Sequence, residues 1–519
     1  MKTITTLLSF GLALGVNAQI SLQDLNQNNV SAMITDGGFF FNNPGTNMHG
    51  YEIPSGSGTH TMYSGAFWFG GVDINGQQKV AAQNMYGSNS DLWPGPLVQD
   101  LATTITPNPM GYTLWSVTKA EVDNHIANFD QPGYIAPSSI TGWPAHGDIS
   151  QGLSYFLAPF VDVNYDGVYD PSVGDHPCIK GDRAVYTIMN DKDDVHGSGG
   201  DPLGIEVHFM FYQFSTTDYL NNTTFMDVDV YNRGTQTLFD FKMSFAYDGD
   251  IGNPTDDYFG CDSVTNMMYM YNGDAMDESS GGVLGYGANP PSAGIICLSH
   301  DMESAMSFNN GASYPYTDPA NATQAWNIMN GNWADNSPVL DDNAQPTKFQ
   351  FSGNPNNTGE WSELNMMNPP GDRRGIMTVS DGTLSYQDHK KFTFAVLYDR
   401  SGTAGVDNVN GLISVANSAQ AFYDTNLEGM CDPEVMGVVE AELSSFSMYP
   451  NPSHGKFSIQ RDRDSQFDLI IRDMSGRTVY EAESLSGEET VIHAEIPSGV
   501  YLVNIVSEGG IMTQKLIVE

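Results

Sequence analysis

Short runs of alternating apolar residues, separated by polar breaks, restrict this chain to a β-rich fold. Ile205–Phe214 alternates throughout, and the runs Phe225–Tyr231 and Leu238–Phe245 follow after the breaks Asn221-Asn222 and Arg233-Gly234. A period of two places successive side chains on opposite faces of a strand. The three runs predict an antiparallel meander. For the whole chain the pattern predicts an all-β fold with minor α content, built from β-sandwich domains with Gly/Asn/Asp-rich loops.

Two stretches are predicted to be helices. They are Val117–Phe129 and Val409–Phe422, and in the second the apolar residues recur at helical intervals. The chain has 519 residues, and domains usually have about 100–200, so several domains are expected. The predicted divisions are a signal peptide at 1–18, an N-terminal β-rich region at 19–202, a central β-sandwich domain at 203–431, a linker at 432–447 and a C-terminal domain at 448–519.

The first residues have the pattern of a secretory signal peptide. Lys2 provides the positive start, Ile4–Val16 is mostly apolar, and Val16-Asn17-Ala18 fits a small-residue cleavage site before Gln19. The apolar run is shorter than the roughly 20 residues that span a bilayer. The sequence has no other apolar run near that length, so we expect an exported protein without a transmembrane segment.

The C-terminal stretch contains several motifs in a fixed order. It opens with Tyr449-Pro450-Asn451-Pro452, continues to the strand pattern Ser498–Val503, and ends with Lys515–Val518. In the run that begins with Val500, Tyr501 and Val503 face opposite to Val500 and Leu502 if the segment is a strand.

Residues 448–519 resemble the type A C-terminal sorting domain of the Bacteroidota type IX secretion system. This resemblance implies a small C-terminal Ig-like β-sandwich that binds the type IX secretion machinery. It also implies export through the periplasm to the outer-membrane surface or the extracellular space.

The central region has a second resemblance. The runs Asp162–Gly167, Asp256–Asp262, Tyr286-Gly287 and Gly371–Arg374 are similar, in this order, to runs in large secreted Bacteroidota proteins of unassigned function. This resemblance implies no known reaction.

The charge balance limits the classes of partner. The chain has 20 basic and 62 acidic residues, for a formal net charge of −42. Nucleic-acid binding needs basic surface, and so does docking to anionic membranes, so neither is expected. The excess of carboxylates is typical of divalent-cation binding or of a solvated acidic surface, and the two can occur together.

Four cysteines are present, Cys178, Cys261, Cys297 and Cys431. They form no CxxC pair, so a zinc ribbon or a thioredoxin-like motif is not expected. Four cysteines allow three pairings, and the sequence alone does not choose among them. One or two disulfides and buried free thiols are both consistent with an exported protein.

One loop in the N-terminal region has the spacing of a calcium-binding loop. Oxygen-bearing side chains at its positions 1, 3 and 5 converge on one point, and Gly167 at position 6 permits the sharp turn. Position 12 is Val173 rather than the glutamate of an EF-hand, and an acidic turn without metal is the alternative. The predicted ligands are Asp162, Asn164, Asp166, the carbonyl of Val168, Asp170 and Asp175.

A second acidic cluster follows the strand pattern that ends near residue 248. Its members are Asp248, Asp250, Asp256, Asp257 and Asp262. So many carboxylates would repel one another unless cations or water separate them. A calcium site, a solvated acidic loop and a catalytic carboxylate pair like that of glycosidases all remain open.

The sequence contains no HExxH, GxSxG or GxxxxGK motif. Two functions therefore remain. The first is a calcium-stabilised binding, adhesion or structural module at the cell surface, with a glycan or protein ligand. The second is a secreted hydrolase acting on polysaccharide or protein. The absence of a catalytic motif favours the first, although a fold can bring distant catalytic residues together.

Overall fold

The computed structural model describes residues 20–46, 48–87, 90–98, 113–309, 311–432, 446–461, 466–473, 478–487, 489–494, 496–507 and 510–518. The predicted signal peptide at 1–18 and most of the predicted linker at 432–447 lie outside these residues. The chain divides into two compact units. The body comprises Met1–Phe160 and Tyr169–Glu428, and the tail unit comprises Val161–Val168 and Gly429–Glu519.

The larger sheet of the body has nine strands among the described residues. β14, β15 and β16 follow one another in the sequence and are also neighbours in this sheet. They pair antiparallel, as do the other strands of the sheet. The strands, in spatial order, are β10 (Trp93–Pro94), β14 (Arg183–Asn190), β15 (Ile205–Gln213), β16 (Thr224–Asn232), β27 (His389–Asp399), β22 (Ser292–Cys297), β19 (Met267–Asn272) and β18 (Asp257–Asp262), with β11 (Trp115–Thr118) also paired to β14.

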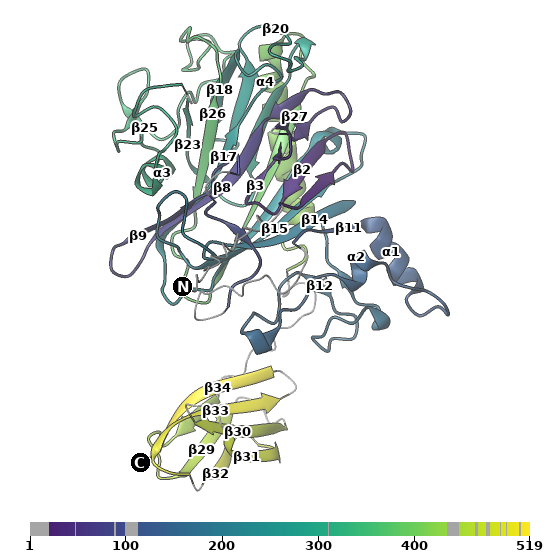
Figure 1. Ribbon diagram of the computed structural model, residues 1–519, viewed down its shortest axis with the longest axis vertical. Coiled ribbons are helices and arrows are strands. Elements are labelled where there is room, and N and C mark those ends of the chain that lie inside the picture. Colours follow the sequence, from purple (N-terminus) through teal and green to yellow (C-terminus); the bar gives the residue numbers. More distant parts are fainter. Residues whose placement is uncertain are drawn as a thin grey trace, which may run out of the picture. The chain divides into compact units, whose positions relative to one another are not determined.

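The second sheet of the body has six described strands. It is the sheet that positions the candidate site, because β17 and β26 pair antiparallel in its centre (Figure 1). In spatial order the strands are β23 (Met302–Phe308), β26 (Arg374–Ser380), β17 (Phe239–Asp248), β8 (Ser64–Val72) and β3 (Phe39–Phe40), with β9 (Gln78–Ala82) paired to β8.

The two sheets share one apolar core. Phe67 on β8 and Phe209 on β15 belong to different sheets, and their ring centroids lie 5.4 Å apart. Phe245 on β17 and Phe394 on β27 contact Phe67 as well, at 4.8 and 5.5 Å. Because these side chains come from the facing surfaces of both sheets, the body is a β-sandwich.

Helices cover the outer faces of the sandwich. Val409, Leu412 and Ala416 of α4 are buried against the outer face of the larger sheet, and α4 packs along β27 (Figure 1). Trp326 of α3 belongs to the apolar cluster on the other face of the second sheet. The helices are α1 (Lys119–Asn128), α2 (Ser138–Thr141), α3 (Ala322–Met329) and α4 (Asn408–Phe422). The helix prediction at 409–422 is confirmed, as is the mostly β fold. The helix predicted at 117–129 is confirmed from Lys119, whereas Val117 and Thr118 belong to β11.

The predicted three-stranded meander is wrong for its third strand. β15 and β16 pair as expected, but β17 crosses to the second sheet and pairs with β8 and β26. The polar break after β16 is long enough to carry the chain across. Local alternation shows that a segment is a strand but does not choose its neighbour. β8 lies before position 202 and β17 lies after it. Their pairing therefore joins the predicted N-terminal region to the predicted central domain.

Shorter elements complete the body. A four-stranded sheet has the order β1 (Leu22–Leu25), β2 (Ser31–Thr35), β6 (Tyr51–Glu52) and β7 (His60–Met62). Two-residue strands pair as β4 (Asn42–Asn43) with β5 (Met48–His49), β20 (Met276–Asp277) with β21 (Gly287–Ala288), and β24 (Val339–Leu340) with β25 (Pro346–Thr347). Two further short strands are β12 (Phe160–Val161) and β13 (His176–Pro177).

The tail unit contains two antiparallel sheets around one core. Tyr501 and Val503 are buried, whereas Val500 and Leu502 are 39% and 38% exposed. The predicted alternation is therefore confirmed. One sheet is β28 (Phe446–Tyr449), β29 (Lys456–Arg461) and β32 (Glu489–His493), and the other is β31 (Thr478–Leu485), β30 (Phe467–Asp473), β33 (Gly499–Ser507) and β34 (Gly510–Val518).

The cysteines fall into two classes. Cys178 and Cys431 are disulfide-bonded. Cys261 and Cys297 are free and buried in the body, and burial raises the pKa of the Cys297 thiol to about 11. The two free thiols are therefore neutral and unreactive at ordinary pH. In the part of the chain that the structure describes, no helix is long and apolar enough to cross a membrane.

Candidate metal centre and neighbouring cavity

Three carboxylates meet at one edge of the second sheet of the body. Asp248 is the last residue of β17, Asp250 follows it by two positions, and Asp372 lies just before β26. The antiparallel register places Asp248 opposite Arg374 at the start of β26, so Asp372 arrives beside the end of β17. One oxygen from each of the three carboxylates lies within 4.8 Å of the others. We call these three residues the carboxylate triad.

Two members of the triad are buried and the third, Asp372, is partly buried, and the group has unused acceptor atoms. Asp248 and Asp250 are each 6% exposed. The Tyr86 hydroxyl donates to Oδ2 of Asp248 at 2.6 Å. The Oδ1 atoms of Asp248 and Asp372 are buried and have no hydrogen-bond partner among the described residues. A buried acceptor without a partner destabilises the fold unless something else satisfies it.

Arg374 is the basic residue that faces Asp248. Its Nε lies 3.7 Å from Oδ2 of Asp248, and its Nη1 donates to Oδ2 of Asp318. Its guanidinium also lies over the Tyr86 ring, 5.2 Å from the centroid. This single guanidinium serves two carboxylates directly, so it does not neutralise the triad.

The pKa values of the three carboxyl groups reflect first their burial and second this deficit of positive charge. Burial raises the pKa of Asp248 to about 6, with Arg374 lowering it and Asp372 raising it further. Burial and the charge of Asp248 raise the pKa of Asp250 well above its usual range. Burial also raises the pKa of Asp372, against the effect of Arg374. Because carboxylate oxygens are the ligands that hard cations prefer, a divalent cation among the three would replace the missing charge.

The other members of the predicted acidic cluster are not part of the triad. Asp257 is buried, its Oδ2 accepts the Ile251 N–H at 2.9 Å, and burial raises its pKa well above the usual range. Burial and Asp277 raise the pKa of Asp256 to about 6. Asp262 lies at the opposite end of β18 and accepts the Val264 N–H at 2.9 Å. The structure thus brings two of the five predicted residues into the triad, and Asp372 completes it.

Asp372 was missed as a ligand by sequence reasoning because it is far from Asp248 along the chain. A signal was present, since Asp372 belongs to the run Gly371–Arg374 that resembles secreted proteins of unassigned function. Nothing in that run by itself indicated that it would pair with the end of β17. The register of β26 against β17 decides this proximity.

The predicted calcium loop has an ordered local conformation. Asp162 is buried, and its carboxylate accepts the N–H groups of Tyr165 and Gly167, each at 2.7 Å. Asn164 donates to Asp166 at 2.8 Å, and Asp166 accepts the exposed Val168 N–H at 2.8 Å. These contacts fix the turn that the sequence predicts.

The last two predicted residues of the calcium loop make their own local contacts. Asp170 caps the 3₁₀ helix η2 (Pro171–Val173) by accepting the Ser172 N–H at 2.8 Å, and Asp175 accepts the Asp170 N–H at 2.8 Å. Calcium binding by this loop stays a prediction.

A cavity of about 150 Å³ lies beside the triad. Trp68, Tyr86, Phe308, Asp318 and Arg374 contribute to its lining. Tyr86 and Arg374 also contact Asp248, so the cavity and the triad share two residues. Oδ1 of Asp318 and Nε of Arg374 have no hydrogen-bond partner among the described residues. We call this space the Arg374 cavity.

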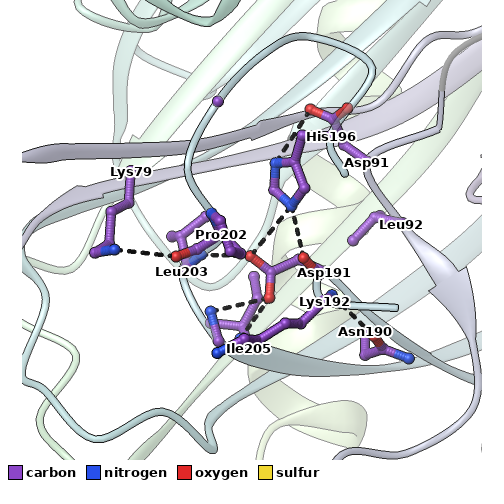
Figure 2. A network of polar contacts seen from close by, with 12 residues as sticks. Lys79, Asp91, Leu92, Asn190, Asp191, Lys192, His196, Pro202, Leu203 and Ile205 are labelled. Atoms are coloured by element: carbon purple, nitrogen blue, oxygen red, sulfur yellow. Dashed lines mark hydrogen bonds and ion pairs between the residues drawn. The ribbon is translucent and has the colours of Figure 1, made fainter. Parts of the chain in front are cut away.

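A buried polar network fixes one wall of the Arg374 cavity. Figure 2 shows His196 between Asp91 and Asp191. Its Nδ1 lies 2.9 Å from the carbonyl oxygen of Val80, and its Nε2 lies 2.6 Å from the carbonyl oxygen of Asp191. A carbonyl oxygen only accepts, so both bonds form together only when both nitrogens carry hydrogen. The carboxylates of Asp91 and Asp191, at 3.6 and 3.8 Å, offset the charge of that form.

The same network holds the loop after β14. The Asp191 carboxylate accepts the N–H groups of Gly204 and Ile205 at 3.0 and 2.8 Å (Figure 2). The Asp91 carboxylate accepts the N–H of Ser198 at 3.0 Å. Ser198 lines the Arg374 cavity. The network therefore positions a wall of the cavity.

A second buried network is structural. Glu206 accepts from His208 at 2.9 Å and from Arg233 at 2.8 Å, and His208 contacts the Tyr186 hydroxyl at 2.7 Å. Burial alone would raise the pKa of Glu206, but Arg233 and His208 lower it to about 2. A carboxylate with this pKa is a fixed counter-ion rather than a proton donor near neutral pH.

The comparisons with known proteins concern mainly the tail. Residues 447–519 match the family described as the secretion system C-terminal sorting domain. This confirms the resemblance to the type IX secretion tail, and the protein is secreted to the cell surface or the extracellular space. No curated protein matches the sequence.

Two solved structures show only distant likeness. A structure described as a polysaccharide lyase has a TM-score of 0.19 at 8% identity, covering 60% of this chain and 34% of the lyase. This chain thus aligns with about a third of the lyase's length. The type IX secretion component PorZ of Porphyromonas gingivalis has a TM-score of 0.13 at 10% identity, covering 95% of this chain and 74% of PorZ. Likeness this low bears on neither fold nor function.

Removal of the sorting domain tests the export route. Without residues 447–519, the exported chain is expected to accumulate in the periplasm, because a signal peptide directs transport only across the inner membrane. Immunoblots of periplasmic, surface and medium fractions would measure this, with the full-length protein as the control. Undiminished levels of the truncated chain at the surface or in the medium would show that another segment directs its export.

Proposed function

We propose that the protein is a secreted or cell-surface binding or adhesion module whose body holds a calcium ion at Asp248, Asp250 and Asp372. The observation that carries this proposal is the buried carboxylate triad, with an oxygen of each residue within 4.8 Å of the others and unpartnered Oδ1 atoms on Asp248 and Asp372. Such an arrangement is unfavourable when empty, because like charges repel strongly in a desolvated site. A bound cation removes both the repulsion and the unsatisfied acceptors.

The chemistry of the triad favours calcium. Its ligands are oxygens only, and the group contains neither imidazole nor thiolate, which are the usual ligands of zinc and copper. Calcium accepts six to eight oxygen ligands in flexible geometry, so water and backbone carbonyls can complete its shell. Extracellular calcium sites commonly have dissociation constants of about 0.1–1 mM, a range that suits a secreted protein.

A binding module fits the surroundings of the triad better than a hydrolase. Asp318 is the one carboxylate in the lining of the Arg374 cavity, and its Oδ2 is paired with Arg374. Glycosidases generally need two carboxyl groups flanking the scissile bond, with unequal pKa values. The described cavity offers no such pair. A secreted hydrolase acting on polysaccharide or protein is thus the weaker alternative.

The loop that begins at Asp162 is proposed as a second calcium site. The support is its sequence spacing together with the turn that Asp162 and Asp166 stabilise. The two proposed sites can be separated by substitution, because they lie on different segments of the chain.

Calcium binding to the triad is expected to weaken as the pH falls. The metal must displace protons, and the pKa of Asp248 is about 6 in the empty site. Competition with one such proton makes the dissociation constant about tenfold larger at pH 5 than at pH 8. Isothermal titration calorimetry of the mature protein with calcium chloride at both pH values would measure this. Asp250→Asn is expected to remove the part of the calcium-binding heat that comes from the triad. Equal binding by this variant and the wild type would overturn the assignment.

A further inference from the structure

We propose that the Arg374 cavity is a subsite for one neutral sugar residue of a carbohydrate ligand, and that calcium in the triad strengthens this binding. The second clause rests on the proposed calcium site, whereas the first stands on the cavity alone. The cavity has a volume of about 150 Å³. A cavity of about this size accommodates a single six-membered ring such as benzene. The Arg374 cavity opens to solvent, so the rest of a chain-like ligand can remain outside it.

The lining combines aromatic surface with polar groups. Trp68, Tyr86 and Phe308 supply the aromatic side chains, and Asp318 and Arg374 supply the charged ones. Small-molecule sites typically have such a composition, with a few polar groups that fix the orientation of the ligand. A pyranose matches it, because its ring carbons are apolar and its edge carries hydroxyl groups.

The charged groups in the lining select hydroxyl groups. The carboxylate of Asp318 can only accept hydrogen bonds, and the guanidinium of Arg374 can only donate them. A hydroxyl group both donates and accepts, so adjacent hydroxyls can serve the two groups together. An amine would satisfy only the carboxylate, and a carboxylate ligand would satisfy only the guanidinium.

Charge also favours a neutral ligand. The two charged lining residues, Asp318 and Arg374, have opposite signs and form an ion pair. The chain as a whole has a formal net charge of −42. Acidic sugars would therefore meet long-range repulsion without a compensating basic cluster. A neutral residue avoids this repulsion.

The triad and the cavity are coupled through Arg374 and Tyr86. When the triad is empty, Arg374 is the cation that faces Asp248 at 3.7 Å. A calcium ion among the three carboxylates takes over this role. Arg374 is then held mainly by Asp318 and is free to donate to a ligand in the cavity.

The test uses the mature full-length protein and a defined panel. Neutral probes are glucose, galactose, mannose, N-acetylglucosamine and the cello-, malto-, xylo- and manno-hexaoses. Glucuronate is the acidic probe and methylamine the cationic one. Ligand-observed NMR and calorimetry would be run in 5 mM calcium and in EDTA, and the melting temperature in each condition would report the calcium site separately. We expect at least one neutral sugar to bind, more tightly with calcium.

Two variants and a control locate the binding. Asp318→Asn, at a side chain 38% exposed, should weaken sugar binding at least about tenfold by removing a charged acceptor. Ala320→Trp, at an exposed position of the lining, should block the cavity and abolish binding. Ala320→Trp should keep the wild-type calcium response. Asp342→Asn, at an exposed loop position outside the lining, should bind like the wild type.

Several results would overturn the sugar proposal. These are no binding of any neutral probe, preferred binding of glucuronate or methylamine, and undiminished binding by Ala320→Trp. Equal affinity in calcium and EDTA would overturn the coupling. If one of these results is found while the wild type still responds to calcium, only the sugar proposal or the coupling fails and the proposed calcium site stands. If the wild type shows no calcium response, the proposed calcium site fails, whatever the sugar probes show.

Discussion

Replacing Asp250 with asparagine is expected to raise the melting temperature of the metal-free protein and to abolish the triad's response to calcium. The pKa of Asp248 is raised to about 6 in the fold, so its folded state holds a proton more tightly than its unfolded state. Stability from this group is therefore present at low pH and is lost as the pH rises from about 4 through 6. At pH 8 the loss is on the order of 3 kcal/mol. Burial and the charge of Asp248 raise the pKa of Asp250 well above its usual range as well, so ionisation of Asp250 also costs stability. The uncharged amide of asparagine removes that cost.

The size of the effect can be stated for the wild type and the variant. About 5 mM calcium is roughly 5–50 times a dissociation constant of about 0.1–1 mM, and binding at that ratio stabilises by about 1–2 kcal/mol. For a unit of roughly 400 residues this corresponds to about 1–3 °C. We expect calcium to raise the wild-type melting temperature by about that amount at pH 8. In EDTA, Asp250→Asn should melt about 2–3 °C above the wild type, because the amide has no charge to be buried or to repel Asp248.

Differential scanning calorimetry at pH 8, in EDTA and in about 5 mM calcium, would measure both effects. Asp342→Asn is the matched control, because it makes the same chemical change at an exposed position. Asp166→Asn reports on the second proposed site, since any calcium response left in Asp250→Asn should disappear when both substitutions are combined. A variant Asp250→Asn that melts below the wild type in EDTA and keeps its calcium response would show that the triad has a purely structural role.

Replacing His196 with alanine is expected to destabilise the body by about 3–5 kcal/mol, because it leaves the buried carboxylates of Asp91 and Asp191 without the imidazole ring that lies between them. The substitution also removes the hydrogen bonds to the carbonyl oxygens of Val80 and Asp191. For a unit of roughly 400 residues the melting temperature should fall by about 4–6 °C. Calorimetry and urea unfolding would measure this loss.

A control substitution and a double-mutant cycle test why the loss of His196 destabilises the protein. His389→Ala removes an exposed histidine at the start of β27 and should change the stability by less than about 0.5 kcal/mol. A double-mutant cycle of Asp91→Asn with His196→Gln should give a coupling of more than about 1 kcal/mol if the ring is charged. Coupling near zero would show that His196 is held as a neutral ring. A His196→Ala protein that melts within about 1 °C of the wild type would contradict the role of the network.

The sequence by itself determined the local structure of the protein and its export destination. The alternation around Tyr501 and Val503 places one set of side chains in the core of the tail unit, as the structure confirms. The helices at 119–128 and 408–422 and the strand at 205–213 were also predictable. In each case the deciding interactions lie within about ten residues, because side-chain period and turn chemistry are local properties.

Only the tertiary structure decided which distant segments meet. The strand pattern before Asp248 did not show that β17 leaves its sequence neighbour β16 and pairs with β26. That pairing alone brings Asp372 to Asp248 and Asp250, and it places Arg374 between the triad and the cavity. The physical reason is that strand partners are chosen by burial of whole sheet faces, a non-local property that a period of two does not encode.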